Sequence, residues 1–292
     1  MRILVIGGGG MLGHKLVQSL GEKFEVWTSI RGDFREIDGY GIFDRDRTLE
    51  RTDVTELESV RRAILAAKPD VIINAAGIVK QLPTSKDVIK SLSVNSIFPH
   101  HLAELSEEFG FRLICISTDC VFDGRKGNYK EKDNPNARDL YGRSKILGEV
   151  TGKNCLTLRT SIIGRELNTS HSLVEWFLSH RGGKVKGYVK AIYSGFPTIV
   201  FADIIADLIL NQRDLSGLFH VSSDPISKFR VLSLINNYFD ANIKIEPFED
   251  FTIDRSLDST KFRNATGFKP QRWETMIERM AEDGAPYDKW RR

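Results

Sequence analysis

The chain has 292 residues, of which 41% are hydrophobic and 28% charged, a composition typical of a soluble globular protein with a full core. Its formal net charge of +3 is too small to indicate nucleic-acid binding, and no apolar run approaches the roughly 20 residues that a membrane span needs. The chain begins directly with a predicted strand, its three cysteines form no CxxC pair, and its six histidines lack metal-ligand spacing. We therefore expect a cytoplasmic protein with reduced thiols, no membrane association and no metal.

The first motif is a short apolar run that leads into Gly7, Gly10 and Gly13, followed by leucines at helical spacing. Length and β-branched content predict a buried parallel strand, a tight glycine turn and a helix. Glycines at this spacing let the backbone approach a ligand closely, and the helix start at Met11 and Leu12 offers free N–H groups to a pyrophosphate. The segment predicts dinucleotide binding.

The end of the second predicted strand, 24–29, bears on the choice of cofactor. An NAD site places a carboxylate there for the ribose 2′-hydroxyl, but Arg31 stands about 18 residues past Gly13. A guanidinium suits a 2′-phosphate, so Arg31 favours NADP(H). NAD(H) is the alternative, with Arg31 in a solvated loop and Asp33 supplying the carboxylate. The polar stretch 32–51 is expected to be a solvated loop.

Two further stretches are candidate cofactor contacts. Asp53 and Val54 precede a predicted helix, where Asp53 could cap the helix or face an adenine amine. After a buried strand, small residues let a cofactor lie against the edge of the sheet; they are Asn74, Ala75, Ala76 and Gly77.

Lys80 and Asn95 are two further polar residues that we expect to lie near the site. Lys80 comes just past a strand end, where open α/β sheets bind ligands, and is a candidate substrate contact. Asn95 lies in a predicted helix, 94–109, beside its apolar face. We count Asn95 among the candidate cofactor contacts, although it is either an ordinary helix residue or a buried polar anchor near the active site.

The reactive side chains gather after the next predicted strand. An apolar run at 112–116 predicts a buried strand that delivers Thr118, and Tyr141 and Lys145 stand four apart at the start of a helical pattern. A phenol and an ammonium on one helix face, near a strand-end hydroxyl, can move a proton to or from an oxygen while a hydride moves. We expect these three residues to be catalytic, with Lys145 lowering the pKa of Tyr141.

A sixth predicted strand at 156–161 completes at least five alternations of strand and helix, which predicts an α/β fold with a doubly wound parallel (Rossmann) sheet. The character of the sequence changes beyond Gly164. We assign 1–163 to an NADP-binding domain, with 200–223 returning to it, and 164–292 to a smaller substrate-binding lobe.

The predicted lobe contains aromatic residues that suit either a substrate wall or a core. We take Trp176, Phe196 and Thr198 as candidate substrate contacts, with core packing equally consistent with the pattern. The last four residues, 289–292, are expected to form a solvated end.

Together these motifs resemble the extended short-chain dehydrogenase/reductases, and within them most closely the dTDP-4-dehydrorhamnose reductase group. The resemblance covers nearly the whole chain. It rests on Gly7-x-x-Gly10-x-x-Gly13, Asn74 to Gly77, Ser117 to Gly124, Tyr141-x-x-x-Lys145, Pro197-Thr198, Leu257 to Lys261, Gly267 to Pro270 and Trp273.

The resemblance implies an oxidoreductase that uses NADPH to reduce the 4-keto group of a nucleotide-diphosphate sugar, in deoxysugar and polysaccharide biosynthesis. It implies that Tyr141 is the acid/base, that Lys145 holds the nicotinamide ribose and that Thr118 orients the carbonyl. It places Asp119 and Cys120 beside the sugar, although the family usually has Tyr at the position of Cys120. It also implies a homodimer.

Two alternatives stay open. In dehydratases of the superfamily an Asp-Glu pair follows the Thr, and Cys120 replaces that Glu, which argues against dehydration. Epimerisation is not distinguished by the sequence. The second alternative is a non-catalytic NADP-binding regulatory subunit, which the intact Tyr141, Lys145 and Thr118 disfavour.

Overall fold

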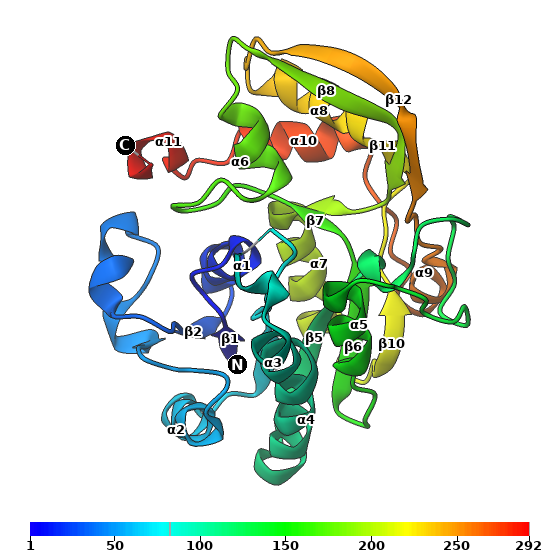
Figure 1. Cartoon of the computed structure of the whole chain (residues 1–292). Coiled ribbons are helices and arrows are strands. Elements are labelled where there is room, and N and C mark those ends of the chain that lie inside the picture. Colours follow the sequence, from blue (N-terminus) through cyan, green and yellow to red (C-terminus); the bar gives the residue numbers. More distant parts are fainter. Residues whose placement is uncertain (82, 292) are drawn as a thin grey trace.

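The computed structural model describes residues 1–81 and 83–291, in which a large parallel sheet carries a smaller lobe at its carboxyl edge (Figure 1). The seven strands lie in the order β10-β6-β5-β4-β1-β2-β3, and every neighbouring pair is parallel. This confirms the predicted doubly wound sheet, whose strand order reverses between β1 and β4, the place where open sheets bind ligands. The strands are β1 Arg2–Ile6, β2 Glu25–Ser29, β3 Thr48–Leu49, β4 Val71–Asn74, β5 Arg112–Thr118, β6 Cys155–Thr160 and β10 Gly217–His220.

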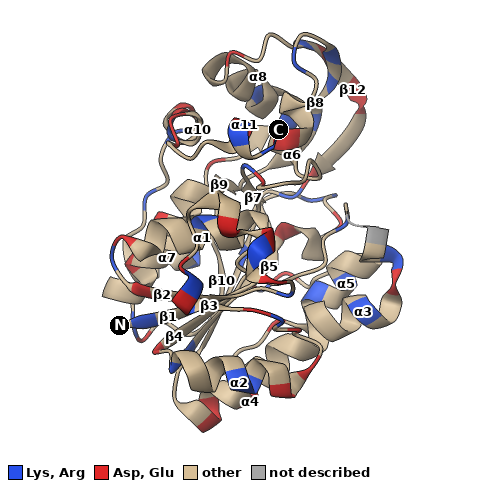
Figure 2. Cartoon of the chain, turned by 90° about the vertical axis from the view of Figure 1, so that its left-hand side faces the viewer, with Lys and Arg blue, Asp and Glu red and all other residues tan. Residues whose placement is uncertain are grey.

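Both faces of the sheet are covered by helices, as the continuous apolar runs of the strands require. Alternate residues of β1 enter different clusters: Ile3 and Val5 pack with α1 and α7, whereas Leu4 and Ile6 pack with α2 and α4. Figure 2 shows these two pairs of helices above and below the strands. The helices around the sheet are α1 Met11–Gly21, α2 Leu57–Ala67, α3 Val88–Leu92, α4 Phe98–Phe109, α5 Leu140–Leu147, α7 Thr198–Asn211 and α9 Thr260–Thr266.

The smaller lobe is built on a three-stranded sheet in the order β11-β8-β12, in which β12 runs parallel and β11 antiparallel to β8. Its elements, with the short pair β7 and β9 beneath it, are α6 Leu173–Leu178, β7 Ile162–Ile163, β8 Lys184–Tyr193, β9 Phe196–Pro197, β11 Ile226–Ser227, α8 Lys228–Tyr238, β12 Lys244–Asp254, α10 Trp273–Ala281 and α11 Tyr287–Trp290.

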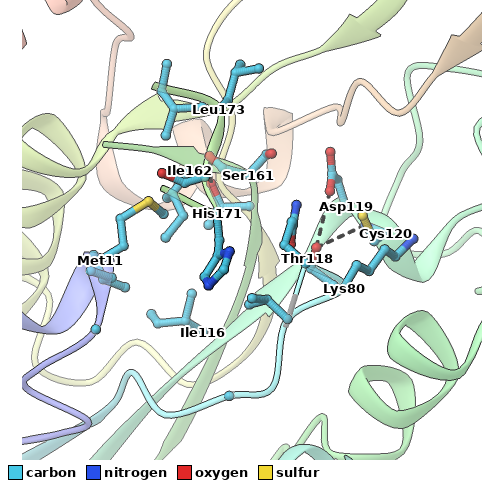
Figure 3. A pocket seen from close by; sticks show the side chains of 18 of the residues that line it. Met11, Lys80, Ile116, Thr118, Asp119, Cys120, Ser161, Ile162, His171 and Leu173 are labelled. Carbon is cyan, nitrogen blue, oxygen red and sulfur yellow. Dashed lines mark hydrogen bonds between the residues drawn. The ribbon is translucent and has the colours of Figure 1, made fainter. Parts of the chain in front are cut away.

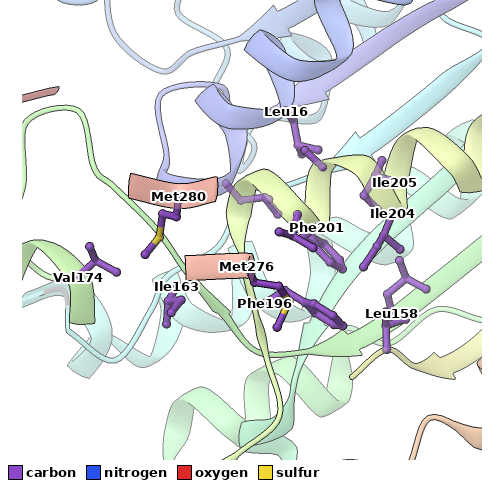
Figure 4. Packing of buried hydrophobic residues seen from close by; sticks show 14 of the residues in the cluster. Leu16, Leu158, Ile163, Val174, Phe196, Phe201, Ile204, Ile205, Met276 and Met280 are labelled. Atoms are coloured by element: carbon purple, nitrogen blue, oxygen red, sulfur yellow. The ribbon is translucent and has the colours of Figure 1, made fainter. Parts of the chain in front are cut away.

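One hydrophobic cluster joins the lobe to the sheet. Leu16 of α1, Phe201 of α7 and Met276 of α10 belong to the same set of buried side chains, although they come from opposite ends of the chain (Figure 4). Burial of apolar area is the main stabilising contribution to folding, and a shared core of this kind restrains relative motion of the two parts.

Two local expectations are corrected by the structure. The stretch 32–51 is not simply a solvated loop: it contains β3 and the 3₁₀ turns η1 Phe34–Glu36, η2 Asp38–Tyr40 and η3 Arg45–Arg47, and its apolar side chains form a small buried cluster. The helix expected at 94–109 divides into the π-helix η5 Ser93–Ile97 and α4. Two 3₁₀ turns complete the set of helices, η4 Pro83–Lys86 and η6 Asp119–Val121. In the described part of the chain, no helix combines the length and apolar character needed to cross a membrane.

Candidate active site

A cavity of about 530 Å³ opens at the carboxyl ends of β1, β4 and β5, and residues of the smaller lobe form its other wall (Figure 3). The sheet-side wall, as we call it here, comprises the lining residues 9–12, 74–77, 79–81, 116–120, Tyr141 and Lys145. The lobe-side wall comprises the lining residues 160–163, 166–169, 171–173, 191–193, Lys228, Ile253 and Arg255.

The glycine turn brings backbone directly against the cavity. Gly7 has φ +88°, and a Cβ there would meet Ala76 N at 3.0 Å, while a Cβ on Gly13 would overlap the Gly7 carbonyl oxygen. Gly10 caps α1 in an extended conformation with no side-chain hydrogen bond to the first turn. The backbone N–H groups of Met11 and Leu12 therefore face the cavity without an intrahelical acceptor, which fits a dinucleotide pyrophosphate.

The segment after β4 forms the next part of the sheet-side wall. Asn74 Oδ1 accepts a hydrogen bond from Ala76 N at 3.2 Å, so the backbone turns at the sheet edge, and 74–77 all line the cavity. Asn95 does not line it. Its amide accepts from Ile78 N at 2.9 Å and donates to Ile78 O and Ser144 Oγ at 3.0 and 3.1 Å. Of the two interpretations of Asn95, the structure supports the buried anchor.

Thr118 stands at the end of β5, and its hydroxyl is held by its own neighbours. Thr118 Oγ1 accepts from Cys120 N at 3.1 Å and donates to Asp119 Oδ1 at 3.2 Å. Figure 3 shows these two bonds as dashed lines at the edge of the cavity. Thr118 is 8% exposed, and its hydroxyl would have to turn from Asp119 to donate to a ligand oxygen.

Helix α5 presents Tyr141 and Lys145 to the same cavity. Asp139 caps the helix by accepting from Gly142 N at 2.9 Å. A Cβ on Gly142 would overlap the Cys120 carbonyl oxygen, so glycine there lets α5 approach η6. Lys145 Nζ donates to Ile116 O at 2.8 Å, which pins the ammonium to the end of β5.

The surroundings of Tyr141 raise the pKa of its phenol. Burial raises the pKa of Tyr141, the nearby Cys120 raises it further, and a hydrogen bond with Thr118 only partly opposes the shift. Lowering of this pKa by Lys145 stays a prediction; the lysine ammonium donates to Ile116 O, and burial lowers the pKa of the lysine itself. Tyr141 is therefore a protonated phenol, a proton donor.

The predicted substrate contacts after β4 and β5 also lie on the sheet-side wall. Lys80 Nζ is 2.9 Å from Asp139 Oδ2 and 5.6 Å from the centre of the Tyr141 ring. Burial raises the pKa of the Asp119 carboxyl, and burial also raises the pKa of the Cys120 thiol to about 11. Cys120 is thus a neutral thiol at physiological pH and provides no base beside the cavity.

Besides Gly7, Gly13 and Asn95, three further predicted cofactor residues lie outside the cavity lining. Arg31 is exposed beyond β2 and makes no ion pair within residues 1–81 and 83–291. Asp33, its competitor in the NAD alternative, is bound to Arg51, with Oδ1 2.6 Å from Nη2. Asp53 accepts two hydrogen bonds from Thr55, so it stabilises the turn before α2, and Val54 packs against the core.

The predicted substrate contacts of the lobe are not part of the cavity lining either. Phe196 is fully buried and packs against Phe201, and Thr198 is buried beside Gly164. Trp176 is 36% exposed and packs against His180. Core packing, the alternative interpretation, describes the first two, because an aromatic pattern is the same in a core and in a wall.

Sequence reasoning missed most of the lobe-side wall. His171, which Figure 3 draws between Met11 and Thr118, belongs to a polar segment that carries no motif. Tyr193, Lys228 and Arg255 reach the cavity from β8, the start of α8 and the end of β12. Their only signal is the pairing of β8 with β12, whose partners lie about 60 residues apart.

The last described residues also return to this region, contrary to the expected solvated end. Arg291 donates to Glu166 O at 3.1 Å and to Ser170 Oγ at 2.5 Å. Tyr287 is buried, and its hydroxyl lies 3.0 Å from His14 Nε2, just behind the glycine turn. Lys289 is exposed as expected, and residue 292 lies outside the described residues. The tail, residues 283–291, therefore connects α1 with the segment that carries His171.

Among the described residues, no group of three His, Cys, Asp or Glu side chains has the arrangement of a metal site. One buried carboxylate near the end of β5, that of Glu149, is paired with a cation. Glu149 binds Arg159 at 2.6 Å in a buried pair and accepts from Ser117 Oγ at 2.6 Å, which supports the end of β5 from below.

Comparison with known proteins identifies close relatives of this arrangement. The family model described as the RmlD substrate binding domain matches residues 1–285. The dTDP-4-dehydrorhamnose reductase of Aggregatibacter actinomycetemcomitans is 26% identical over 306 aligned positions, which cover 95% of this chain and 97% of that protein. The dTDP-4-dehydrorhamnose reductase of Burkholderia thailandensis is 32% identical over 241 positions, covering 76% and 73%. The crystal structure of dTDP-4-dehydrorhamnose reductase from Bacillus anthracis in complex with NADP matches with a TM-score of 0.77 and 24% identity, over 96% of this chain and 98% of that one.

Proposed function

The chain belongs to the RmlD substrate binding domain family, and we propose from this premise that it reduces the 4-keto group of a nucleotide-diphosphate deoxysugar with NADPH. The observation that carries the proposal is the meeting of Thr118, Tyr141 and Lys145 with the glycine turn in one cavity. These groups come from three separate segments, and a purely structural role gives no reason for them to converge on open space.

The cofactor would lie along the sheet-side wall. The N–H groups at the start of α1 would bind its pyrophosphate, and the small residues Ala75 to Gly77 would let it rest against the sheet edge. Lys145, held at the end of β5, would contact the nicotinamide ribose. When bound, NADPH supplies the hydride for the ketone carbon.

The protein's own contribution is a proton and its placement. Tyr141, kept protonated by burial, would donate its proton to the oxygen that gains negative charge during reduction. Thr118 would donate a hydrogen bond to the same oxygen by turning its hydroxyl from Asp119. Both donors stand on regular elements, β5 and the capped α5, so their separation is fixed before substrate binds.

The lobe-side wall would hold the substrate. Lys228 and Arg255 line this wall and act electrostatically on the buried Asp119 carboxyl, and Lys80 adds a third cation from the sheet side. Cations at a cavity mouth attract an anionic diphosphate. We accordingly assign cofactor binding to 1–163 together with 200–223, and substrate binding to the rest of 164–292.

Preference for NADPH over NADH is assigned to Arg31. Its guanidinium is exposed at the end of β2, and the competing carboxylate of Asp33 is bound to Arg51. A 2′-phosphate would therefore meet an exposed cation at this position, with the carboxylate of Asp33 held by Arg51.

Dehydration and a purely regulatory role have weaker support. Dehydration of the sugar needs a base at the position of Cys120, where the thiol is neutral because burial raises its pKa. A regulatory subunit has no need of Thr118, Tyr141 and Lys145 around an open cavity.

We also propose a homodimer. Four large apolar side chains are exposed on the adjacent elements α3, η5 and α5; they are Val88, Ile89, Ile97 and Leu147. Ile89 is 80% exposed, and exposed apolar side chains on adjacent elements favour association of identical subunits. Light scattering should give twice the chain mass, and Ile89→Glu should give the monomer. A monomeric wild type would contradict the proposal.

The decisive experiment measures NADPH oxidation with a panel of 4-keto nucleotide sugars. We expect turnover of at least one member and a loss of about 10²–10⁴-fold in kcat for Tyr141→Phe, because general acid catalysis contributes about that much. Tyr188→Phe, an exposed tyrosine of β8 outside the cavity lining, is the matched control. Equal oxidation of NADPH by wild type and Tyr141→Phe would refute the assignment of the acid.

A further inference from the structure

Tyr193, the last residue of β8, has a buried hydroxyl without a hydrogen-bond partner. The side chain is 4% exposed, and its oxygen is the buried side-chain atom for which residues 1–81 and 83–291 provide no partner. A buried hydroxyl left unpaired costs free energy, and native proteins rarely keep one without a reason. Tyr193 also lines the cavity, which supplies such a reason.

Three polar side chains near Tyr193 are hydrogen-bonded, which argues against loose local packing as the cause of the unpaired hydroxyl. Ser194 Oγ accepts from Leu257 N at 2.9 Å, Ser223 Oγ donates to Gly195 O at 2.7 Å, and Trp273 Nε1 donates to Asp224 O at 2.8 Å. The exception lies at the one aromatic side chain of this group that faces the cavity.

The position of the hydroxyl is fixed from two sides. The backbone of Tyr193 pairs with Ile226 in the β8–β11 ladder, and its ring packs against Trp273 with the centroids 5.5 Å apart. Burial, followed by the negative charge of Asp119, raises the pKa of Tyr193, so the phenol is a neutral donor. Tyr193 and Asp119, the residue next to Thr118, both line the cavity.

We propose that Tyr193 is a specificity-determining residue whose hydroxyl hydrogen-bonds the sugar ring of the bound nucleotide sugar. This inference rests on the proposed function and deepens it. Sugar hydroxyls and the ring oxygen can accept a hydrogen bond from a phenol in this cavity. A site that hydrogen-bonds a substrate hydroxyl discriminates against analogues that lack it, because its buried partner is then left unpaired.

Binding measurements test this contact without requiring turnover. Calorimetry would compare dTDP-glucose, which has no 4-keto group to reduce, with dTDP alone, on the full chain saturated with NADP⁺. For Tyr193→Phe we expect affinity for dTDP-glucose to fall about 10-fold, the effect of one hydrogen bond, and affinity for dTDP to stay within about 2-fold. Tyr188→Phe, on the same strand but exposed, should change neither.

A stability measurement separates this role from a structural one. Because the hydroxyl has no partner in the free protein, Tyr193→Phe should leave the urea midpoint unchanged or raise it. A lower midpoint would mean that Asp119 or a bound water uses the hydroxyl, and would overturn the proposal. An unchanged affinity for dTDP-glucose, or equal losses for dTDP-glucose and dTDP, would overturn it as well.

The two proposals fail separately. If wild type reduces no 4-keto sugar but Tyr193→Phe still loses sugar-dependent affinity, the reductase assignment fails and the Tyr193 contact stands. If wild type turns over a 4-keto sugar and Tyr193→Phe keeps the same KM and affinity, the reductase assignment stands and the contact fails.

Discussion

The two walls of the cavity are built differently. The sheet-side wall consists of backbone turns and side chains at the ends of β1, β4 and β5, each a few residues from the strand that positions it. The lobe-side wall is assembled from β8, β12, α8 and the segment before α6, which the tail holds in place. The first wall carries the groups proposed for proton transfer, and the second carries those proposed to select the substrate.

We therefore expect the sheet-side wall to determine the rate of the chemical step and the lobe-side wall to determine which substrate binds. A donor such as Thr118 depends on local geometry, so its loss should lower kcat. A residue on the lobe-side wall depends on contacts between distant segments, so its loss should appear in KM. The following predictions test that division, from the largest expected effect to the smallest.

Thr118→Val removes a hydroxyl from the sheet-side wall with little change in shape. We expect kcat to fall about 10²–10³-fold, the usual cost of one donor to a developing negative charge, with a small change in KM. Steady-state kinetics against NADPH and the sugar would measure it. Thr118→Ser keeps the hydroxyl and should recover most of the rate. If Thr118→Val changed only KM, the proposed division between a catalytic sheet-side wall and a substrate-binding lobe-side wall would be contradicted.

The contact between His14 of α1 and Tyr287 of the tail should contribute less stability at acidic pH. Burial lowers the pKa of His14 to about 4, from 6.5, so the unfolded chain binds the proton more readily. The free energy of unfolding should therefore fall as the pH drops from about 6.5 toward 4, by about 1.4 kcal/mol per pH unit for this histidine.

Urea titrations at several pH values would measure that slope. His220, whose pKa burial also lowers to about 4, should contribute a similar slope. His14→Gln should therefore remove about half of the acid sensitivity and leave the rest. An identical slope in wild type and His14→Gln would show that the histidine titrates alike in the folded and unfolded chains.

Arg31→Ala tests cofactor choice on the sheet side. We expect KM for NADPH to rise about 10-fold while KM for NADH changes little, because one charge-assisted contact to the 2′-phosphate is lost. Arg35→Ala, an exposed arginine in the same stretch, is the matched control. If the KM values for NADPH and NADH rose together, Arg31 would be stabilising the fold of this stretch and would not be binding the 2′-phosphate.

Arg291→Ala loosens the tail on the lobe side. The side chain donates to Glu166 O and Ser170 Oγ in the segment that lines the cavity. We expect KM values to rise about 2- to 5-fold, which corresponds to less than about 1 kcal/mol, with kcat nearly unchanged. Lys289→Ala, an exposed cation two residues earlier, should have no effect. A drop in kcat would show that the tail also positions the sheet-side wall.

The sequence predicts the sheet-side wall well because its signals are local. A glycine turn after an apolar run, and Tyr141 four residues before Lys145, are patterns within one or two elements. The lobe-side wall depends on the parallel pairing of β8 with β12, and on His14 and Lys15 meeting Tyr287 and Asp283. No short-range pattern encodes such partners.

Individual side chains show the same limit. Phe196 and Tyr193 are both aromatic and lie three residues apart, but only Tyr193 lines the cavity. Asn95 was ambiguous in the sequence, since only the folded chain shows that Ile78 and Ser144 use its amide. The contact of Lys145 with Ile116 O likewise depends on the folded chain, because no short-range pattern places the ammonium at the end of β5.

The ion pair between Lys80 and Asp139 has a practical consequence. The two side chains are 35% and 46% exposed, so their attraction is worth no more than about 1 kcal/mol and weakens in concentrated electrolyte. Asp139 also caps α5 through Gly142 N, a bond that dissolved ions screen far less. Michaelis constants from buffers of unequal ionic strength should therefore disagree even where melting curves coincide, and laboratories comparing enzyme preparations should fix the salt first.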